Sequence, residues 1–236
     1  MDAEKGFPKW FFPVVLVFVV ATGISCISQY SKIFKKNNAD IKGKDLKTAA
    51  FFIADQIEAD PHFTDLISYV NANHNDLMIP ADYKTDLTAS ESAFNSYMDE
   101  HYNEDEIFLF ENNKMSLNEL DSEAQKLYAK YRMEYWYNTF AENKEKYNLS
   151  ELSFCYPLEG KENTVIVIID PGKNEIGDAF LNLCQEKYLD PKENEILWKT
   201  WEAGTSMDKY DETNGMAYTN IVLSNDEKAG LIHAVR

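Results

Sequence analysis

Residues 128–140 combine aromatic rings with one guanidinium at helical spacing. The members of this group are Tyr128, Tyr131, Arg132, Tyr135, Trp136, Tyr137 and Phe140. In a binding pocket such an arginine can pair with a carboxylate while the rings cover an apolar or cationic group. The same spacing is expected of a helix that packs its core face against a sheet and exposes ordinary tyrosines. The pattern therefore indicates either a ligand pocket or a packed helix, and both interpretations stay open.

The sequence does not contain the residue patterns typical of enzymes. The four histidines, His62, His74, His101 and His233, are far apart, and none belongs to an HxH or HExxH pattern. The chain also has no phosphate-binding loop, dinucleotide fingerprint or nucleophile elbow. The acidic run at residues 99–106 lacks the spacing and the glycine of a calcium loop, which favours a solvated face. The sequence therefore predicts no catalytic residues, no cofactor and no metal site.

The acidic balance of the chain restricts its partners. The 236 residues include 40 acidic and 23 basic side chains, which give a formal net charge of −17. Because this charge repels DNA, RNA and anionic lipid, we expect no nucleic-acid partner. The 14 phenylalanines, 14 tyrosines and 4 tryptophans nevertheless provide the apolar surface that a folded core requires.

The three cysteines permit at most one disulfide bond. Cys26 lies in an apolar run, whereas Cys155 and Cys184 lie in the polar remainder of the chain. None of them stands beside a histidine or a second cysteine at metal-ligand spacing. The sequence favours buried free thiols for Cys155 and Cys184, with a disulfide between them as the alternative.

The apolar run from Trp10 to Ile27 predicts a membrane segment. No charged residue falls between Lys9 and Lys32, and this interval exceeds the roughly 20 residues with which a helix crosses the hydrocarbon. We therefore assign residues 1–9 to an N-terminal tail and residues 10–29 to a transmembrane signal anchor.

The orientation of this anchor in the membrane follows less directly from the sequence. Six lysines follow the run within about twenty residues, which favours a cytoplasmic domain by the positive-inside rule. A long folded domain behind an N-terminal span weakens that rule, and we expect the domain to be extracytoplasmic. Gly23-Ile24-Ser25-Cys26 also follows a basic segment and an apolar segment, as in the signal of a bacterial lipoprotein. Cys26 would then be the lipidated N-terminus, which is the alternative to an ordinary cysteine in a membrane helix.

Residues 30–115 are predicted to form a stalk helix and a helical region. Residues 29–58 contain no proline and carry apolar side chains at helical spacing, so we expect them to continue the membrane helix. Asp60-Pro61 predicts the start of a short helix that ends before Asp76, and Thr88-Ala89-Ser90-Glu91 predicts a capping box that opens another. The apolar residues 107–110 are expected to be a strand or a packed turn.

Residues 116–236 are predicted to form a long helix and an antiparallel sheet. A capping box at residues 116–119 precedes a helix expected to end near Lys146. Residues 152–158 and 164–170 are β-branched and aromatic on either side of a turn, so they should pair, and residues 216–235 should form a closing hairpin. A short helix is expected within residues 179–188. The predicted fold class is thus α+β: a membrane helix continuing into a long helix, a helical insertion, and an antiparallel sheet domain.

The order of these features resembles a Cache domain, the PAS-like extracytoplasmic sensor domain of bacterial membrane receptors. The matching features are the membrane run with its long helix, the hairpin at residues 152–170, the Ile176-Gly177-Asp178 loop, residues 198–204, the strand that starts at Gly215-Met216-Ala217-Tyr218-Thr219, and the closing hairpin. The resemblance covers residues 116–236. The chain departs from the family in its longer helical region at residues 60–110 and in having no second membrane helix before Arg236, so we expect it to be the N-terminal piece of a longer receptor.

The resemblance implies a ligand site between the sheet and the loops or helix that cover it. Carried onto this sequence, it points to Tyr131, Tyr135, Tyr156, Asp170, Trp198, Trp201 and Tyr218, to which the aromatic group adds Arg132. These eight residues are the candidate ligand-binding set.

Together the sequence features predict the extracytoplasmic small-molecule sensing module of a membrane-bound signal-transduction receptor. A ligand would bias two arrangements of the membrane-proximal helix, through which we expect the protein to form a homodimer. The alternative is a membrane-anchored or lipidated bacterial surface protein that binds a partner without signalling. A second membrane span downstream would distinguish the receptor from the surface protein.

Overall fold

The computed structural model describes residues 43–77, 85–158, 160–171, 183–211, 215–224 and 227–236, together with Gln29. The chain divides into two compact units, Met1–Lys42 and Gly43–Arg236, and every element discussed below belongs to the second. Within the described ranges, none of the helices combines the length and apolar character that crossing a bilayer requires. The predicted membrane run at residues 10–27, Cys26 and the Ile176-Gly177-Asp178 loop lie outside these ranges.

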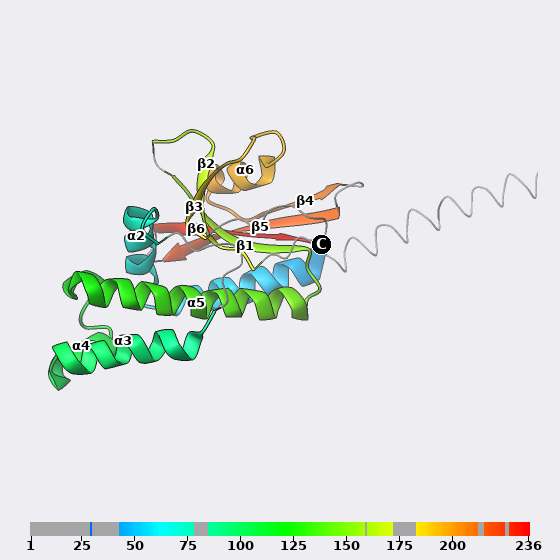
Figure 1. Cartoon of the computed structure of the whole chain (residues 1–236). Helices are drawn as coiled ribbons and strands as arrows, with labels where there is room; N and C mark the ends of the chain where they lie inside the picture. Colours follow the sequence, from blue (N-terminus) through cyan, green and yellow to red (C-terminus); the bar gives the residue numbers. More distant parts are fainter. Residues whose placement is uncertain are drawn as a thin grey trace, which may run out of the picture. The chain divides into compact units, whose positions relative to one another are not determined.

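A six-stranded antiparallel sheet organises the unit Gly43–Arg236. Its strands are β1 (Glu151–Pro157), β2 (Thr164–Ile169), β3 (Gln185–Tyr188), β4 (Met207–Asp211), β5 (Gly215–Ser224) and β6 (Glu227–Val235). They lie in the order β3-β2-β1-β6-β5-β4. Figure 1 shows the sheet with α6 (Glu195–Ala203) on one side and α5 (Ser122–Lys146) on the other. The two predicted hairpins are confirmed as the pairs β1–β2 and β5–β6, and β1 also pairs with β6 at the centre of the sheet. The predicted α+β class is therefore confirmed.

Helices cover both faces of this sheet. They are a first helix described over residues 43–58, α2 (Phe63–Asn73), α3 (Leu87–His101), α4 (Glu104–Glu111), the 3₁₀ turn η1 (Leu117–Glu119), α5 (Ser122–Lys146) and α6 (Glu195–Ala203). The first helix, α2 and α5 form the main core with one face of the sheet, and α6 packs on the other face. Helices α3 and α4 pack on the outer side of α5 (Figure 1).

The side chains of strand β2 show why helices pack on both faces of the sheet. Side chains alternate along a strand, so Ile166 and Ile168 join the core beneath α5, whereas Val165 and Val167 join the cluster beneath α6. All four are buried. Strand β2 is apolar along its length because both of its faces are covered.

Two predicted segments differ from the structure, and a third segment, residues 198–203, had no predicted secondary structure. Residues 107–110 belong to α4, because Asn103 and Glu106 form a capping box that opens a helix rather than a strand. Gln185–Tyr188 is not helical but pairs as the edge strand β3 with β2. Residues 198–203 lie in α6, which ends at Gly204 in a left-handed conformation.

The predicted helix starts are shifted by a few residues. Helix α3 begins at Leu87, where the Asp86 side chain accepts a hydrogen bond from Ala89 N, so the capping box predicted at Thr88 is wrong. The capping box at Ser116 is present but opens η1. Helix α5 starts later, at Ser122, and ends at Lys146 as predicted.

Asp121 caps the N-terminus of α5. Its carboxylate accepts hydrogen bonds from Glu123 N at 2.9 Å and Ala124 N at 3.0 Å. The hydroxyls of Tyr97 and Tyr102 also donate to it, at 3.2 Å and 2.8 Å. The hydrogen bond from Ala124 N, followed by those of the tyrosines, lowers the pKa of Asp121 although partial burial opposes the change.

Replacing Asp121 by alanine is expected to lower the free energy of unfolding by about 1 kcal/mol at pH 7, the usual loss for an N-cap. Since the pKa of Asp121 is lower in the folded state, its charge stabilises the fold above the unfolded pKa of about 3.9, and this contribution disappears as the pH falls through the folded value. Urea unfolding at neutral and strongly acidic pH should therefore show a loss that shrinks in acid. The exposed Asp99 of α3 provides a control, Asp99→Ala, and an equal loss at both pH values would contradict this role.

The two cysteines of the described chain are free and buried. Cys155 belongs to the cluster beneath α6, whereas Cys184 belongs to the core on the opposite face. Val167 lies between them, since it pairs with Cys155 and its carbonyl accepts a hydrogen bond from Cys184 N at 2.6 Å. The predicted free thiols are confirmed, and the alternative disulfide is wrong because the two side chains leave the sheet on different faces.

Burial raises the pKa of both thiols to about 12. We therefore expect a thiol reagent at pH 8 to leave Cys155 and Cys184 unmodified in the folded protein and to label both after unfolding, because only the thiolate reacts. Peptide mass spectrometry reports each cysteine separately and so excludes the signal of Cys26. Rapid labelling of either residue in the native protein would show that its surroundings open readily.

Candidate functional site

Arg132 and Asp60 form the centre of the first candidate site, which we call the Arg132 site. Arg132 projects from α5, and Asp60 lies in the connection between the first helix and α2. Arg132 Nη2 donates to Asp60 Oδ2 at 2.5 Å, and Asp60 Oδ1 accepts a hydrogen bond from His62 N at 3.2 Å. The Arg132 side chain is 16% exposed and that of Asp60 is 8% exposed. The ion pair is therefore largely buried, and the carboxylate that meets Arg132 comes from the protein itself.

Aromatic rings surround the Arg132 guanidinium. Its Cζ lies 4.5 Å from the ring centroid of Tyr135, 5.6 Å from that of Tyr131 and 5.7 Å from that of Trp136. These distances are typical of cation–π contacts, which gain strength when the cation is desolvated. Tyr135 and Trp136 follow Arg132 by three and four residues, and residues at this spacing lie on the same side of a helix. Tyr131 is the neighbour of Arg132 in the sequence.

The electrostatics of the site keep Arg132 charged and the tyrosine beside it neutral. Burial by itself lowers the pKa of Arg132, but the charge of Asp60 and other neighbours outweigh burial and hold that pKa above its ordinary value. Burial, followed by the charge of Asp60, raises the pKa of Tyr128 well above its usual range. The Tyr128 hydroxyl is thus protonated at every physiological pH.

An open hollow of about 410 Å³ lies over the ion pair. Its lining comes from the end of the first helix, the connection to α2, the turn after α4, and α5: Gln56, Ala59, Asp60, Pro61, His62, Asn113, Tyr128, Arg132, Tyr135 and Trp136. Three buried polar atoms of these residues, Gln56 Oε1, Arg132 Nε and Trp136 Nε1, have no hydrogen-bond partner among the described residues. Native proteins rarely leave such atoms unpaired, so each is a place where a small molecule or water can bind.

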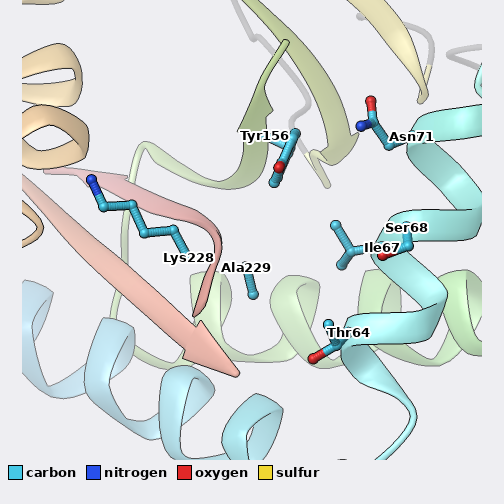
Figure 2. A pocket seen from close by; sticks show the side chains of 7 residues that line it. All are labelled: Thr64, Ile67, Ser68, Asn71, Tyr156, Lys228 and Ala229. Carbon is cyan, nitrogen blue, oxygen red and sulfur yellow. The ribbon is translucent and has the colours of Figure 1, made fainter. Parts of the chain in front are cut away.

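A second cavity, the Tyr156 cavity, lies between α2 and the sheet. It has a volume of about 90 Å³, and its lining residues are Thr64, Ile67, Ser68, Asn71, Tyr156, Lys228 and Ala229 (Figure 2). The ring of Tyr156 lies 5.7 Å from that of Trp201 in an edge-on contact. Lys228 Nζ donates to the Trp201 carbonyl and points away from the cavity, so the cavity meets only the apolar stem of this lysine (Figure 2).

The eight residues of the predicted ligand-binding set do not meet at one place. Arg132 and Tyr135 line the Arg132 site, whereas Tyr131 is not among the lining residues and its hydroxyl donates to Glu91 Oε1 at 3.2 Å. Tyr156 lines the Tyr156 cavity, and Trp201, which is not part of the lining, contacts the ring of Tyr156. The predicted set therefore divides between two hollows.

The other three members lie apart from both. Trp198 lies in α6 and packs against the cluster beneath that helix, and its Nε1 donates to the Leu189 carbonyl at 3.3 Å. Tyr218 is buried in the main core, 5.9 Å from the ring of Phe51 on the first helix. Asp170 follows β2, where its charge, after burial, contributes to the raised pKa of Tyr137.

Sequence reasoning missed two residues of the Arg132 site. Asp60 was interpreted only as a helix cap, although Asp60-Pro61 directly follows the first helix, and Gln56 carries no motif. The position of Asp60 could have indicated its role. A carboxylate between the end of one helix and the start of the next is fixed by both helices, so it can meet a partner on a third. Its pairing with Arg132 joins residues 72 positions apart.

Neither a metal site among the described residues nor a sequence match identifies the protein's function. Within the described residues, no group of histidine, cysteine, aspartate or glutamate side chains is arranged to hold a metal ion. No protein-family model matches the chain, and no curated protein sequence matches it.

Two solved structures resemble the fold at low similarity. One is the sensory domain of the Campylobacter jejuni chemoreceptor Tlp3 (CcmL), with a TM-score of 0.31, 11% identity, and coverage of 74% of this chain and 64% of that chain. The other is the ligand-binding domain of Tlp3 from the same organism in complex with L-valine, with a TM-score of 0.30, 11% identity, and coverage of 74% and 63%. The chain thus spans less than two thirds of the length of these domains, and its membership of the Cache family stays a prediction.

Proposed function

We propose that this chain is the extracytoplasmic small-molecule sensing module of a membrane-bound signal-transduction receptor, and that its ligand binds at the Arg132 site. The observation that carries this proposal is the set of three unpaired buried polar atoms, from Gln56, Arg132 and Trp136, beside an open hollow. A buried donor or acceptor without a partner costs about 1–3 kcal/mol. A ligand that supplies the missing hydrogen-bond partners recovers this free energy, and the recovered free energy favours ligand binding.

Binding at this site would require a change of conformation. The three unpaired atoms lie beneath the surface of the hollow, so a ligand reaches them only when lining side chains move aside. A ligand that binds one arrangement better than another shifts the balance between the two. The same geometry that buries the polar atoms would therefore make the domain responsive to its ligand.

The first helix is the element placed to transmit that response. Gln56 belongs to it, and Asp60 follows directly after its end, so two parts of the ion-pair site depend on the position of this helix. The sequence predicts that residues 29–58 continue the membrane segment. Under this proposal, ligand binding biases the membrane-proximal helix, which pairs with its copy in a homodimer.

The antiparallel sheet behind a long helix agrees with the PAS-like sensor domain that the sequence resembles. Here β1 and β6 are neighbours in the middle of the order, and the short strand β3 is added at one edge.

A thermal-shift screen of the full chain in detergent tests the proposal. The panel consists of amino acids, carboxylates, amines and nucleobases, and a binding compound at one hundred times its Kd should stabilise the protein by about 2.7 kcal/mol. The shift should disappear in Arg132→Gln and in Trp136→Phe, which removes the indole donor but keeps a ring. The control Tyr156→Phe alters the second cavity and should leave the shift intact. A folded protein that no compound stabilises would count against a small-molecule sensor.

The orientation of the domain is tested separately. A single reactive cysteine introduced as Ser31→Cys in a Cys26→Ala background should react with a membrane-impermeant thiol reagent added from outside intact cells. Reaction only after the cells are opened would place the domain in the cytoplasm, as the lysines after the apolar run favour.

A further inference from the structure

The charges of the Arg132 site cancel within the protein. Among the described residues that line the hollow, Arg132 and Asp60 are the only lysine, arginine, aspartate or glutamate side chains, and they are paired with each other. His62 also lines the hollow, where its Nε2 lies 3.1 Å from the Phe110 carbonyl and its ring stacks on Phe110. The lysine, arginine, aspartate and glutamate side chains of the lining therefore carry no net charge.

A charged ligand would have to break the Arg132–Asp60 pair. An anion could reach the paired face of the guanidinium only by displacing Asp60, whose side chain is 8% exposed and would stay buried without a cation. A cation would have to displace Arg132 from Asp60 in the same way. Because an unpaired buried charge is strongly unfavourable, the site disfavours ligands of either sign.

The hydrogen-bonding capacity that remains has a definite pattern. Two donors, Arg132 Nε and Trp136 Nε1, and one acceptor, Gln56 Oε1, are unpaired. A carbonyl oxygen has two lone pairs and can accept from both donors, while an N–H next to it can donate to the acceptor. The flat rings of Tyr128 and Tyr135 in the lining suit a planar group.

From these observations we infer that the Arg132 site binds an uncharged ligand through an amide group, a carbonyl beside an N–H. This inference rests on the proposed function and specifies the class of ligand. It also revises the expectation that Arg132 pairs with a ligand carboxylate, since Asp60 already occupies that role. An amide of this kind occurs in a primary carboxamide and in the lactam edge of a nucleobase.

Two matched pairs of compounds test the inference on the full chain by isothermal titration calorimetry in detergent. Nicotinamide and nicotinate differ by an amide against a carboxylate, and uracil and orotate differ by one added carboxylate. The uncharged member of a pair should bind about tenfold more tightly or better, equivalent to about 1.4 kcal/mol. Binding of nicotinamide alone assigns the carboxamide, binding of uracil alone assigns the lactam, and binding of both shows that the amide itself is recognised.

Asp60→Asn provides the sharpest variant. It keeps the acceptor that caps His62 N but frees the charge of Arg132, so the preference should invert, with the acid gaining about tenfold over the amide. The exposed Asp99→Asn is the matched control and should leave the preference unchanged. If Asp60→Asn does not fold, the comparison of each amide with its matching carboxylate in the natural protein still tests the inference.

The outcomes separate this inference from the proposed function. Two results would overturn the amide inference and leave the sensor proposal standing. One is tighter binding of nicotinate than of nicotinamide, or of orotate than of uracil. The other is a simple carboxylate that binds the natural protein but not Arg132→Gln. Binding that survives both Arg132→Gln and Trp136→Phe would place the ligand elsewhere and overturn the inference as well. If no compound of the broad panel binds, both proposals fall together.

Discussion

Replacing Arg132 by methionine is expected to lower the free energy of unfolding by about 3–5 kcal/mol. Methionine can keep the apolar contacts beneath Tyr135 and Trp136, but it leaves the buried carboxylate of Asp60 without its cation. Removing one partner of a buried ion pair costs far more than the pair contributes as a whole, because the remaining charge is desolvated and uncompensated. Urea unfolding at neutral pH measures the loss.

Two further variants identify the cause of that loss. The double variant Asp60→Asn with Arg132→Met removes both charges and should recover most of the stability. Arg236 pairs with Asp45 in a more exposed position, with side chains 24% and 37% exposed, so Arg236→Met should cost about 1 kcal/mol or less. A loss for Arg132→Met as small as that of Arg236→Met would show that the Arg132–Asp60 pair is effectively solvated.

The parts of the fold that were predicted correctly depend on local patterns. The hairpin β1–β2 follows from two β-branched runs around a short turn, and β5–β6 from two runs that can only be neighbours. The end of α5 at Lys146 lies in a polar segment that places Lys144 and Lys146 in the last turn, where basic side chains favour a helix C-terminus. In each case the determining residues lie within a few positions of one another.

The errors occur where a local pattern supports two structures. Residues 107–110 are four consecutive apolar side chains, and only the capping box formed by Asn103 and Glu106 selects the helix. Strand β3 is short and polar, and its conformation depends on backbone pairing with β2 rather than on its own residues. A cap directly before the segment therefore decided the first case, and tertiary pairing decided the second.

The candidate site was predicted in part for the same reason. Arg132 and Tyr135 are one turn apart on α5, so their proximity is visible in the sequence. The carboxylate of Asp60 and the amide of Gln56 reach the site through the packing of the first helix against α5, which no local pattern reveals. Consequently the sequence identified the cation but not its partner, and the partner changes the class of ligand that we expect.

Replacing Gly230 by alanine is expected to be nearly as damaging as the loss of Arg132. Gly230 lies in β6 directly against the ring of Phe154, and a Cβ added there would meet Phe154 Cζ at 2.3 Å. The ring cannot move aside easily, because it is fully buried and packs edge-on against Phe63 at 5.5 Å and Phe140 at 6.5 Å. Overpacking of a rigid core costs about 1–3 kcal/mol. The φ of +154° at Gly230 adds backbone strain, which brings the expected loss to about 3–4 kcal/mol.

Gly160 separates the two causes of this loss. It also has a positive φ, +78°, but nothing lies within 4 Å of an added Cβ, so Gly160→Ala should lose only about 1–2 kcal/mol from backbone strain. Combining Gly230→Ala with Phe154→Leu should then cost less than the sum of the two single changes, because the smaller side chain makes room for the methyl group. Strict additivity in urea unfolding would show that the ring is not what excludes a side chain at position 230. In that case the backbone conformation of β6, rather than the packing of Phe154 across the central strands β1 and β6, would explain why position 230 requires a glycine.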